Sequence, residues 1–137
     1  MNLEQINYAA VITAAVSAFV VGGLWYSPFL FGNAWLSAAG LSEEKLKNRG
    51  KGHSAMVFVL SFIFALAGAL VFALIVGPKP ALGFSITAGF LIGFVWVAGS
   101  FAINYLFEAR SFKLWAINGG YHTIQYSLYG IILGLWP

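Results

Sequence analysis

Charged residues are confined to a few short stretches of the chain, and this distribution constrains the fold more than any other feature. Four long intervals contain no Asp, Glu, Lys or Arg: Glu4 to Glu43, Lys51 to Lys79, Lys79 to Glu108, and the chain after Lys113. Only 8% of the 137 residues are charged, whereas soluble domains average about 25%. A helix needs about 20 mostly apolar residues to cross a bilayer, and each interval is long enough for one.

The sequence therefore predicts an all-α, polytopic membrane protein that forms a single transmembrane domain over residues 1–137. Four transmembrane helices are expected at about 6–27, 54–77, 81–106 and 114–135. Pro28 should end the first helix because proline cannot continue the backbone hydrogen bonds. The Gly77-Pro78-Lys79-Pro80 stretch is typical of a compact turn between the second and third helices.

The basic residues predict the orientation in the membrane. The loop 28–53 contains Lys45, Lys47, Arg49 and Lys51, and the loop 107–113 contains Arg110 and Lys113. The opposite side has only Lys79. Because basic loops favour the cytoplasmic side, we expect both loops to be cytoplasmic and both termini to lie outside the inner (plasma) membrane.

The first of these loops should have structure of its own. Its start, PFLFGNAWLSAAG, mixes large apolar residues with small polar ones, which is typical of a short helix at the membrane interface. Gly40 should end this helix, and Ser42 should cap a second one that begins with two acids. Four residues are assigned to the interfacial region: Trp25, Tyr26, Pro28 and Trp35.

Two stretches, GGLWYSPFLFGNAWLSAAGLS and INYLFEARSFKLWAINGGYHTIQYSLYGIILGLW, resemble the domain-of-unknown-function family 1761. The residues that carry the resemblance are Trp25-Tyr26-Ser27-Pro28, Leu30-Phe31-Gly32, Trp35, Leu106-Phe107-Glu108, Asn118 and Tyr121-His122. The family consists of small, mostly bacterial integral membrane proteins. The resemblance covers nearly the whole chain and implies a protein with four spans, but it implies no activity.

Polar residues inside the third and fourth hydrophobic segments form the main candidate site. His122 lies nine residues beyond Lys113, which places it about 13 Å into a core about 30 Å thick. The third segment contributes Ser100, Asn104 and Glu108, and the fourth contributes Asn118, His122 and Gln125. Lipid cannot satisfy such groups, so we expect the two sets to face each other as a polar seam, with Asn104 bonded to Asn118.

The polar seam has two interpretations that the sequence leaves open. Asn, Gln, His and Ser commonly link membrane helices, for about 0.6 kcal/mol per hydrogen bond. Alternatively, His122 titrates near neutrality and can serve a pathway for protons or solutes. Glu108 likewise either joins Arg110 and Lys113 in an interfacial ion cluster or gates such a pathway.

No constellation for catalysis or metal binding is evident. The chain has no Cys and no Asp, and its two histidines, His53 and His122, are expected at different depths. Neither a Ser-His-Asp set nor a zinc motif can be formed from these residues. We predict no enzyme activity, no cofactor and no metal, and the net charge of +3 is explained by topology without nucleic acid.

Glycine pairs predict close helix packing. Gly89 and Gly93 on the third segment, and Gly130 and Gly134 on the fourth, form small-xxx-small motifs. They can pack inside one four-helix bundle or join two copies. Because four short helices enclose little space, we expect a homo-oligomer, and the lipid bilayer or a larger membrane complex as the remaining partners.

Three functions remain open at this stage, of which a membrane enzyme acting on lipid has the least support because acid, base and metal-binding groups are few. The first is passage, in a small transporter or channel-like protein lined by the polar seam. The second is a non-catalytic accessory or lipid-interacting membrane subunit, whose aromatic helix and basic loop would contact headgroups.

The substitution His122→Ala separates the first two functions. Passage predicts that it abolishes a flux in liposomes while the folded protein stays intact. The accessory role predicts mainly a lower thermal stability, and unchanged flux would remove His122 from a transport mechanism.

Overall fold

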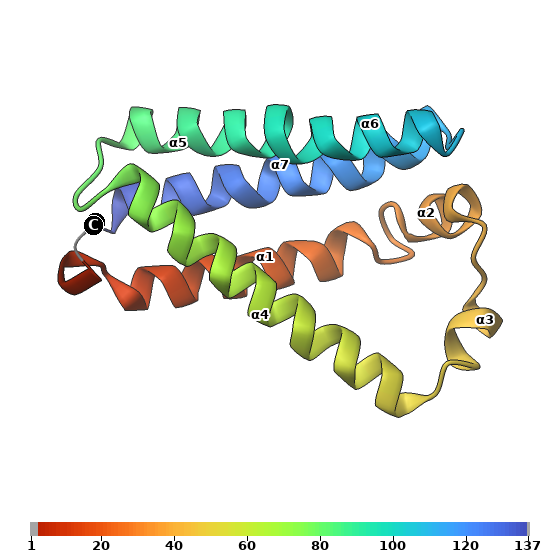
Figure 1. Ribbon diagram of the computed structural model, residues 1–137. Coiled ribbons are helices and arrows are strands. Elements are labelled where there is room, and N and C mark those ends of the chain that lie inside the picture. Colours follow the sequence, from red (N-terminus) through yellow and green to blue (C-terminus); the bar gives the residue numbers. More distant parts are fainter. Residues whose placement is uncertain (1–2, 137) are drawn as a thin grey trace.

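Four long helical stretches and three short helices make up the fold (Figure 1). The computed structural model describes residues 3–136, and this part of the chain contains no β-strand. A short helix η1 (Leu3–Gln5) precedes α1 (Tyr8–Trp25), and two small helices, α2 (Gly32–Ala39) and α3 (Glu43–Lys47), connect it to α4 (Lys51–Val76). The third long stretch is α5 (Leu82–Leu91), the π-helical segment η2 (Ile92–Ala98) and α6 (Gly99–Phe107), and α7 (Phe112–Leu135) ends the fold.

The four long stretches coincide with the predicted spans to within a few residues. Three of them, α1, α4 and the continuous stretch Leu82–Phe107, are long and apolar enough to cross a membrane. Helix α7 has 24 residues but is not among the described helices that reach this apolarity, because Asn118, His122 and Gln125 lower its mean hydropathy. The all-α prediction is confirmed, and a fourth crossing by α7 stays a prediction.

The connector 28–53 folds as its local sequence signals indicate. Helix α1 ends at Trp25, just before Pro28, and Gly40 ends α2 in the left-handed conformation with φ 68°. The Ser42 side chain accepts a hydrogen bond from the backbone N–H of Lys45 and so caps α3. Helix α2 also packs against α7, which ties the connector to the rest of the fold.

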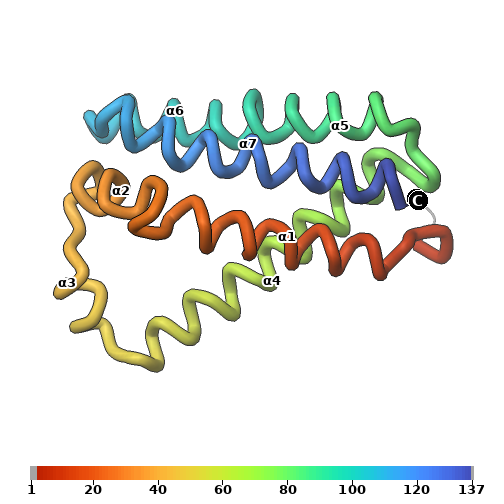
Figure 2. Tube along the Cα trace, turned by 180° about the vertical axis from the view of Figure 1, so that it is seen from behind, coloured from red at the N-terminus to blue at the C-terminus, as the bar shows by residue number. Residues whose placement is uncertain are grey.

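Helix α7 lies between α1 on one side and the α5–α6 stretch on the other (Figure 2). Its closest neighbour is α5, and glycines on both helices make this approach possible. A Cβ at Gly93 would lie 2.7 Å from Thr123 Cα, and one at Gly130 would overlap the Ser85 carbonyl group. The Ser85 hydroxyl donates to the Gly130 carbonyl oxygen at 2.8 Å, so the two backbones are also joined by a hydrogen bond.

Both glycine motifs are therefore used inside one chain. Gly89 and Gly93 of the α5–η2 stretch face the backbone of α7, and Gly130 and Gly134 of α7 face α5. Gly89, Gly93 and Gly130 are buried by that contact and Gly134 is half-buried, so these faces are not available to a second copy. A homo-oligomer stays a prediction, but its interface must lie on other faces.

Helix α4 packs closely against α1 along only half of its length. Small residues meet where the helices touch: Ala10, Ala14 and Ala18 on α1, and Ala65, Ala69 and Ala73 on α4, are all buried. Further along, the rings of Phe19 and Phe62 stand between the helices with centroids 5.4 Å apart. Because small side chains lie between the helices at one end and rings at the other, α4 diverges from α1 (Figure 1). Residues 51–60 of α4 are all exposed.

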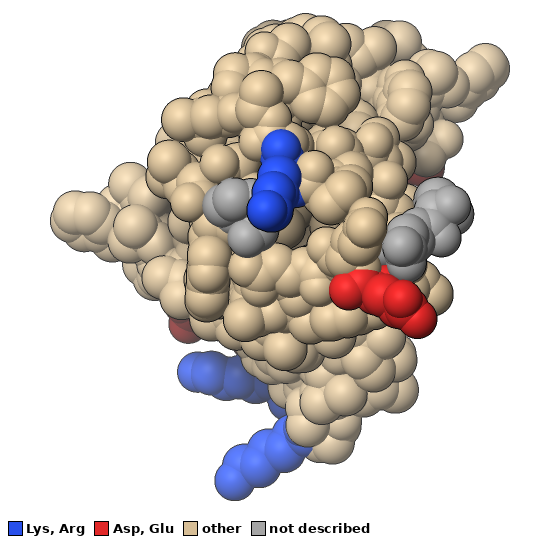
Figure 3. All heavy atoms as spheres, turned by 90° about the vertical axis from the view of Figure 1, so that its left-hand side faces the viewer, with Lys and Arg blue, Asp and Glu red and all other residues tan. Residues whose placement is uncertain are grey.

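The surface carries few charges. In space-filling view, the end of the molecule formed by η1 and the turn 77–81 shows one basic and one acidic side chain on an otherwise uncharged face (Figure 3). Large apolar side chains, among them Phe58, Phe64, Phe94 and Leu106, are exposed along the sides of the helices. Such a surface is what a bilayer would cover.

Gly130→Ala tests the close contact between α5 and α7. The added methyl group must displace the Ser85 backbone, and overpacking of this kind costs about 1–3 kcal/mol. We expect a lower unfolding temperature in detergent or nanodiscs. Gly83→Ala in the first turn of α5, where a Cβ meets nothing within 4 Å, is the matched control and should leave the stability unchanged or slightly raised. Equal stability of the two variants would contradict the contact.

Candidate functional site

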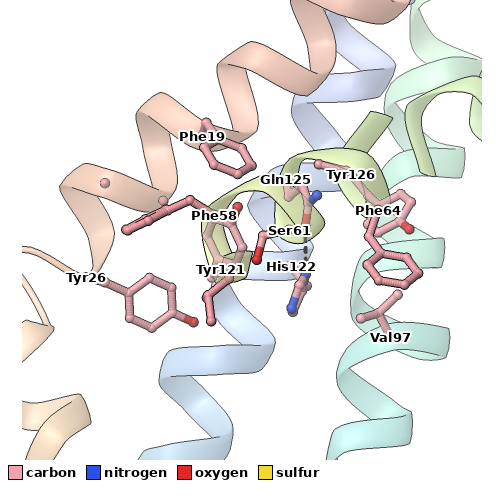
Figure 4. A pocket seen from close by; sticks show the side chains of 14 residues that line it. Phe19, Tyr26, Phe58, Ser61, Phe64, Val97, Tyr121, His122, Gln125 and Tyr126 are labelled. Carbon is pink, nitrogen blue, oxygen red and sulfur yellow. Dashed lines mark hydrogen bonds between the residues drawn. The ribbon is translucent and has the colours of Figure 1, made fainter. Parts of the chain in front are cut away.

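The divergence of α4 from α1 opens a cleft on the side of the molecule, which we call the lateral cleft (Figure 4). It has a volume of about 510 Å³, within the range of small-molecule sites. Helices α1 and α4 form its walls and α7 its floor, and Val97 of η2 reaches its edge. Its lining is mostly apolar and aromatic: Phe19, Gly22, Gly23, Tyr26, Val57, Phe58, Ser61, Phe64, Ala65, Val97, Tyr121, His122, Gln125 and Tyr126.

Near the α2 end, aromatic side chains hold α7 in place through their polar atoms. Asn118 accepts a hydrogen bond from the Tyr26 hydroxyl at 2.8 Å and donates to the Tyr105 oxygen at 2.8 Å. The Trp25 indole donates to the Ile117 carbonyl at 2.9 Å, and the Tyr121 hydroxyl donates to the Ala18 carbonyl at 2.9 Å. Helix α7 is thus bonded to both α1 and α6.

Deeper in the fold, three side chains of α7 form a chain of hydrogen bonds that ends on α4. His122 Nδ1 lies 2.7 Å from Gln125 Oε1, and Gln125 Nε2 donates to the Tyr129 oxygen at 2.7 Å. The Tyr129 hydroxyl donates to the Ala65 carbonyl oxygen at 3.0 Å. Gln125 and Tyr129 are buried, so this chain satisfies groups that water cannot reach.

The His122 ring sits at the cleft with one nitrogen uncommitted. Its face stacks on the Phe101 ring of α6, with centroids 5.4 Å apart, and its edge meets Tyr121. Within residues 3–136, Nε2 has no hydrogen-bond partner, and no side-chain nitrogen or oxygen is both buried and unpaired. Nε2 is therefore accessible, and His122 lines the lateral cleft.

The hydroxyl groups of Ser61 on α4 and Tyr126 on α7 also have no hydrogen-bond partner among the described residues. Both residues line the lateral cleft, but the Tyr126 hydroxyl lies beside Gly68 of α4, where a Cβ would be 3.2 Å from it, and Gly68 is not part of the lining. Other serines of the long helices, such as Ser17 and Ser127, bond to carbonyls of their own helix. The free Ser61 hydroxyl extends toward the space above α7 (Figure 4).

The predicted polar seam is only half present. Asn118, His122 and Gln125 turn inward, but Ser100, Asn104 and Glu108 are exposed on the outer side of α6. The expected bond between Asn104 and Asn118 is wrong, because Tyr26 and Tyr105 occupy the Asn118 amide. Ser100 bonds instead to the Trp96 carbonyl of its own helix at 2.6 Å.

The physical reason is the contact between α5 and α7. The faces of Gly89 and Gly93 must point at α7, and the exposure of Ser100 and Asn104 shows that their side of the stretch points away. The π-helical segment Ile92–Ala98 contains Gly93 and precedes Ser100, so it also shifts the helical register between the glycine face and the polar face.

Glu108 pairs with Arg110, one of the two basic residues expected in an ion cluster around it. Its Oε2 lies 3.5 Å from Arg110 Nε, and both side chains are exposed. Exposed pairs of this kind contribute little to stability. Nothing in the described part of the chain brings three of His, Cys, Asp and Glu together as a metal site.

The interfacial residues lie where α1 meets α2. Trp25 and Tyr26 bond to α7, as described above, and the Tyr26 ring packs against Trp35 with centroids 5.5 Å apart. Pro28 is exposed in the turn. A Cβ at Gly32 would lie 2.5 Å from the Tyr26 carbonyl oxygen, so this tight turn requires glycine.

Sequence reasoning gave no role in the site to Tyr105 or Tyr126, which looked like interfacial aromatics. Tyr129 follows Gln125 by four residues, and side chains at that spacing are neighbours on a helix, but the spacing does not reveal its bond to Ala65 of α4.

Fold and surface together define a small all-α protein of the kind that membranes accommodate. Residues 9–134 match the family DUF1761, described as a protein of unknown function. The chain therefore belongs to this family, as the sequence motifs indicated. No curated protein and no solved structure matches the chain.

Tyr129→Phe tests the hydrogen-bond chain from His122 to Ala65. Loss of the hydroxyl leaves the buried Gln125 amide without an acceptor, which costs about 1–3 kcal/mol. We expect a lower midpoint of thermal unfolding. Tyr126→Phe is the matched control because its hydroxyl has no partner among the described residues, and it should unfold like the parent protein. A Tyr129→Phe protein as stable as the control would contradict the chain.

Proposed function

We propose that this protein binds a lipophilic molecule with one polar group, which enters the lateral cleft sideways from the membrane. The observation that carries the proposal is the combination of an apolar cleft of about 510 Å³ with two uncommitted polar groups, the Ser61 hydroxyl and His122 Nε2. Uncommitted polar groups inside a bilayer are costly. A ligand whose polar group bonds to them, and whose remainder is apolar, removes that cost.

The position of the opening supports entry from the lipid. The lateral cleft lies between α1 and α4, and exposed apolar residues of α4, such as Phe58 and Phe64, border it. A ligand already dissolved in the hydrocarbon can diffuse past these side chains without contact with water. The proposed role develops the lipid-interacting alternative of the sequence analysis.

An open ion or water channel has less support. The outward position of Ser100, Asn104 and Glu108 leaves the polar seam without its second side. On α7, the Asn118 and Gln125 amides are bonded within the protein, as expected for groups that link helices.

A carrier for the same ligand is the second candidate. Buried side chains close the space between α1, α4 and α7 toward the 77–81 turn, where Ala69, Phe72 and Tyr129 pack together. Toward α2 and α3 the two walls diverge (Figure 1). A site that is closed at one end and open at the other is the shape that one state of a carrier requires.

On this proposal all four long helices, α7 included, cross the inner membrane, and the basic loop 28–53 faces the cytoplasm. The wide end of the lateral cleft then lies in the cytoplasmic half of the bilayer. We expect a second copy or a larger membrane complex to contact the outer faces of α4 or α6.

Gly23→Leu tests the proposed binding. Gly23 lines the lateral cleft, and a Cβ there meets nothing within 4 Å, so the larger side chain fills the cleft without disturbing the packing. The probe is a long-chain alcohol with a diazirine in its chain, photoactivated in nanodiscs and mapped by mass spectrometry. We expect saturable labelling of the 57–64 and 121–126 regions in the parent protein, reduced about tenfold in the variant, as for a loss of about 1.4 kcal/mol of binding free energy.

The control is Gly83→Leu, outside the lateral cleft, which should label like the parent protein. Labelling that is spread over all exposed helix faces and is not displaced by excess unlabelled alcohol would contradict the proposal. Movement of the alcohol between the leaflets of liposomes, present in the parent protein and absent in Gly23→Leu, would favour the carrier.

A further inference from the structure

The hydrogen-bond chain behind His122 determines which kind of polar group the lateral cleft can accept. Its last member is the Ala65 carbonyl oxygen, which can only accept a hydrogen bond. Tyr129 must therefore donate its single proton to Ala65, at 3.0 Å. The Tyr129 oxygen is then left as an acceptor.

The role of Tyr129 fixes the donor and acceptor roles of Gln125 and His122 on the same helix. Because Tyr129 accepts, the group of Gln125 that faces it at 2.7 Å is the amide NH₂. The other end of that side chain, Oε1, can only accept. His122 Nδ1, at 2.7 Å from Oε1, must therefore carry the proton.

A neutral imidazole carries one proton, so the opposite nitrogen is an acceptor. His122 Nε2 thus presents a lone pair to the lateral cleft, and no described residue donates to it. The Ser61 hydroxyl can donate or accept. The hydroxyls of Tyr26 and Tyr121 already donate to Asn118 and to the Ala18 carbonyl oxygen.

No Asp, Glu, Lys or Arg lines the lateral cleft. A permanently charged ligand would lose its hydration there without gaining an opposite charge, which is unfavourable. The preferred polar group is therefore neutral.

We infer that the ligand is a lipophile with a neutral hydroxyl group, which donates its O–H to His122 Nε2 and accepts from the Ser61 hydroxyl. The inference rests on the proposed binding function and names the chemical class of its ligand. An ether, ester or ketone can accept from Ser61 but leaves His122 without a donor. The lateral cleft should therefore discriminate against such molecules even when their apolar parts are identical.

The test compares a long-chain diazirine alcohol with its methyl ether, both photolabelled in nanodiscs at several concentrations. We expect the alcohol to half-saturate the cleft at a concentration about tenfold lower than the ether, the effect of one hydrogen bond to an otherwise unsatisfied group. His122→Phe keeps an aromatic ring against Phe101 but removes Nε2, and it should bring the alcohol and the ether to equal affinity. Its unfolding temperature, measured alongside, shows that the fold is retained.

The tautomer gives a second readout that does not depend on binding. Nitrogen-15 NMR of the protein labelled at His122 should show the proton on Nδ1 and a bare Nε2. Gln125 and Tyr129 are positioning residues, so Gln125→Leu should shift this population toward Nε2–H and reduce the preference for the alcohol.

The outcomes separate the inference from the proposed function. Equal affinities of alcohol and ether in the parent protein, or a dominant Nε2–H tautomer, would overturn the inference while cleft binding stands. Non-saturable labelling by both probes would overturn the binding function and the inference with it. If His122→Phe unfolds, His122→Leu is used in its place because leucine cannot accept a hydrogen bond, and a preference for the alcohol that survives there would also overturn the inference.

Discussion

The direct contact between the backbones of α5 and α7 is the constraint on which the rest of this structure depends. The two backbones can approach because Gly89, Gly93 and Gly130 have no side chains. The Ser85 hydroxyl stabilises the contact by donating a hydrogen bond to the Gly130 carbonyl oxygen. Once this face of α7 is fixed against α5, the helix can no longer rotate. Its amide, imidazole and tyrosine groups must then turn toward α1 and α4, which is where the lateral cleft opens. In a membrane, where water does not drive helices together, close approach of small residues is the main source of such order.

The remaining architecture follows from side-chain size along the contact between α1 and α4. Alanines on both helices permit close packing at one end, whereas Phe19 and Phe62 occupy the space between the helices at the other. The lateral cleft is thus a consequence of where small and large residues stand in two apolar helices. The polar groups on its floor are held by bonds that run away from the cleft, so their orientation does not depend on a ligand. This preorganisation is the condition under which a site can discriminate between ligands.

Much of the fold could be predicted from the sequence, because its signals are local. The long intervals without charge predicted the long helices. Gly40 and Ser42 correctly predicted the end of α2 and the start of α3. The inward position of His122 and Gln125 also followed, since neither can be left in lipid. The partners of these residues could not be predicted. Spacing along one helix does not reveal its rotation, and the π-helical segment Ile92–Ala98 shifts the register between Gly89 and the polar residues that begin at Ser100. Asn118 is therefore hydrogen bonded to Tyr26 and Tyr105 and not to Asn104, which faces outward.

A structure determined in lipid nanodiscs, with the molecules that accompany the protein out of its native membrane, tests the central claim most directly. We expect α4 to diverge from α1 in that structure. We also expect an elongated non-protein density in the lateral cleft, with one end at hydrogen-bonding distance from His122 Nε2. A helix α4 closed onto α1 along its whole length, with His122 bonded to another side chain and no space beside it, would contradict the claim.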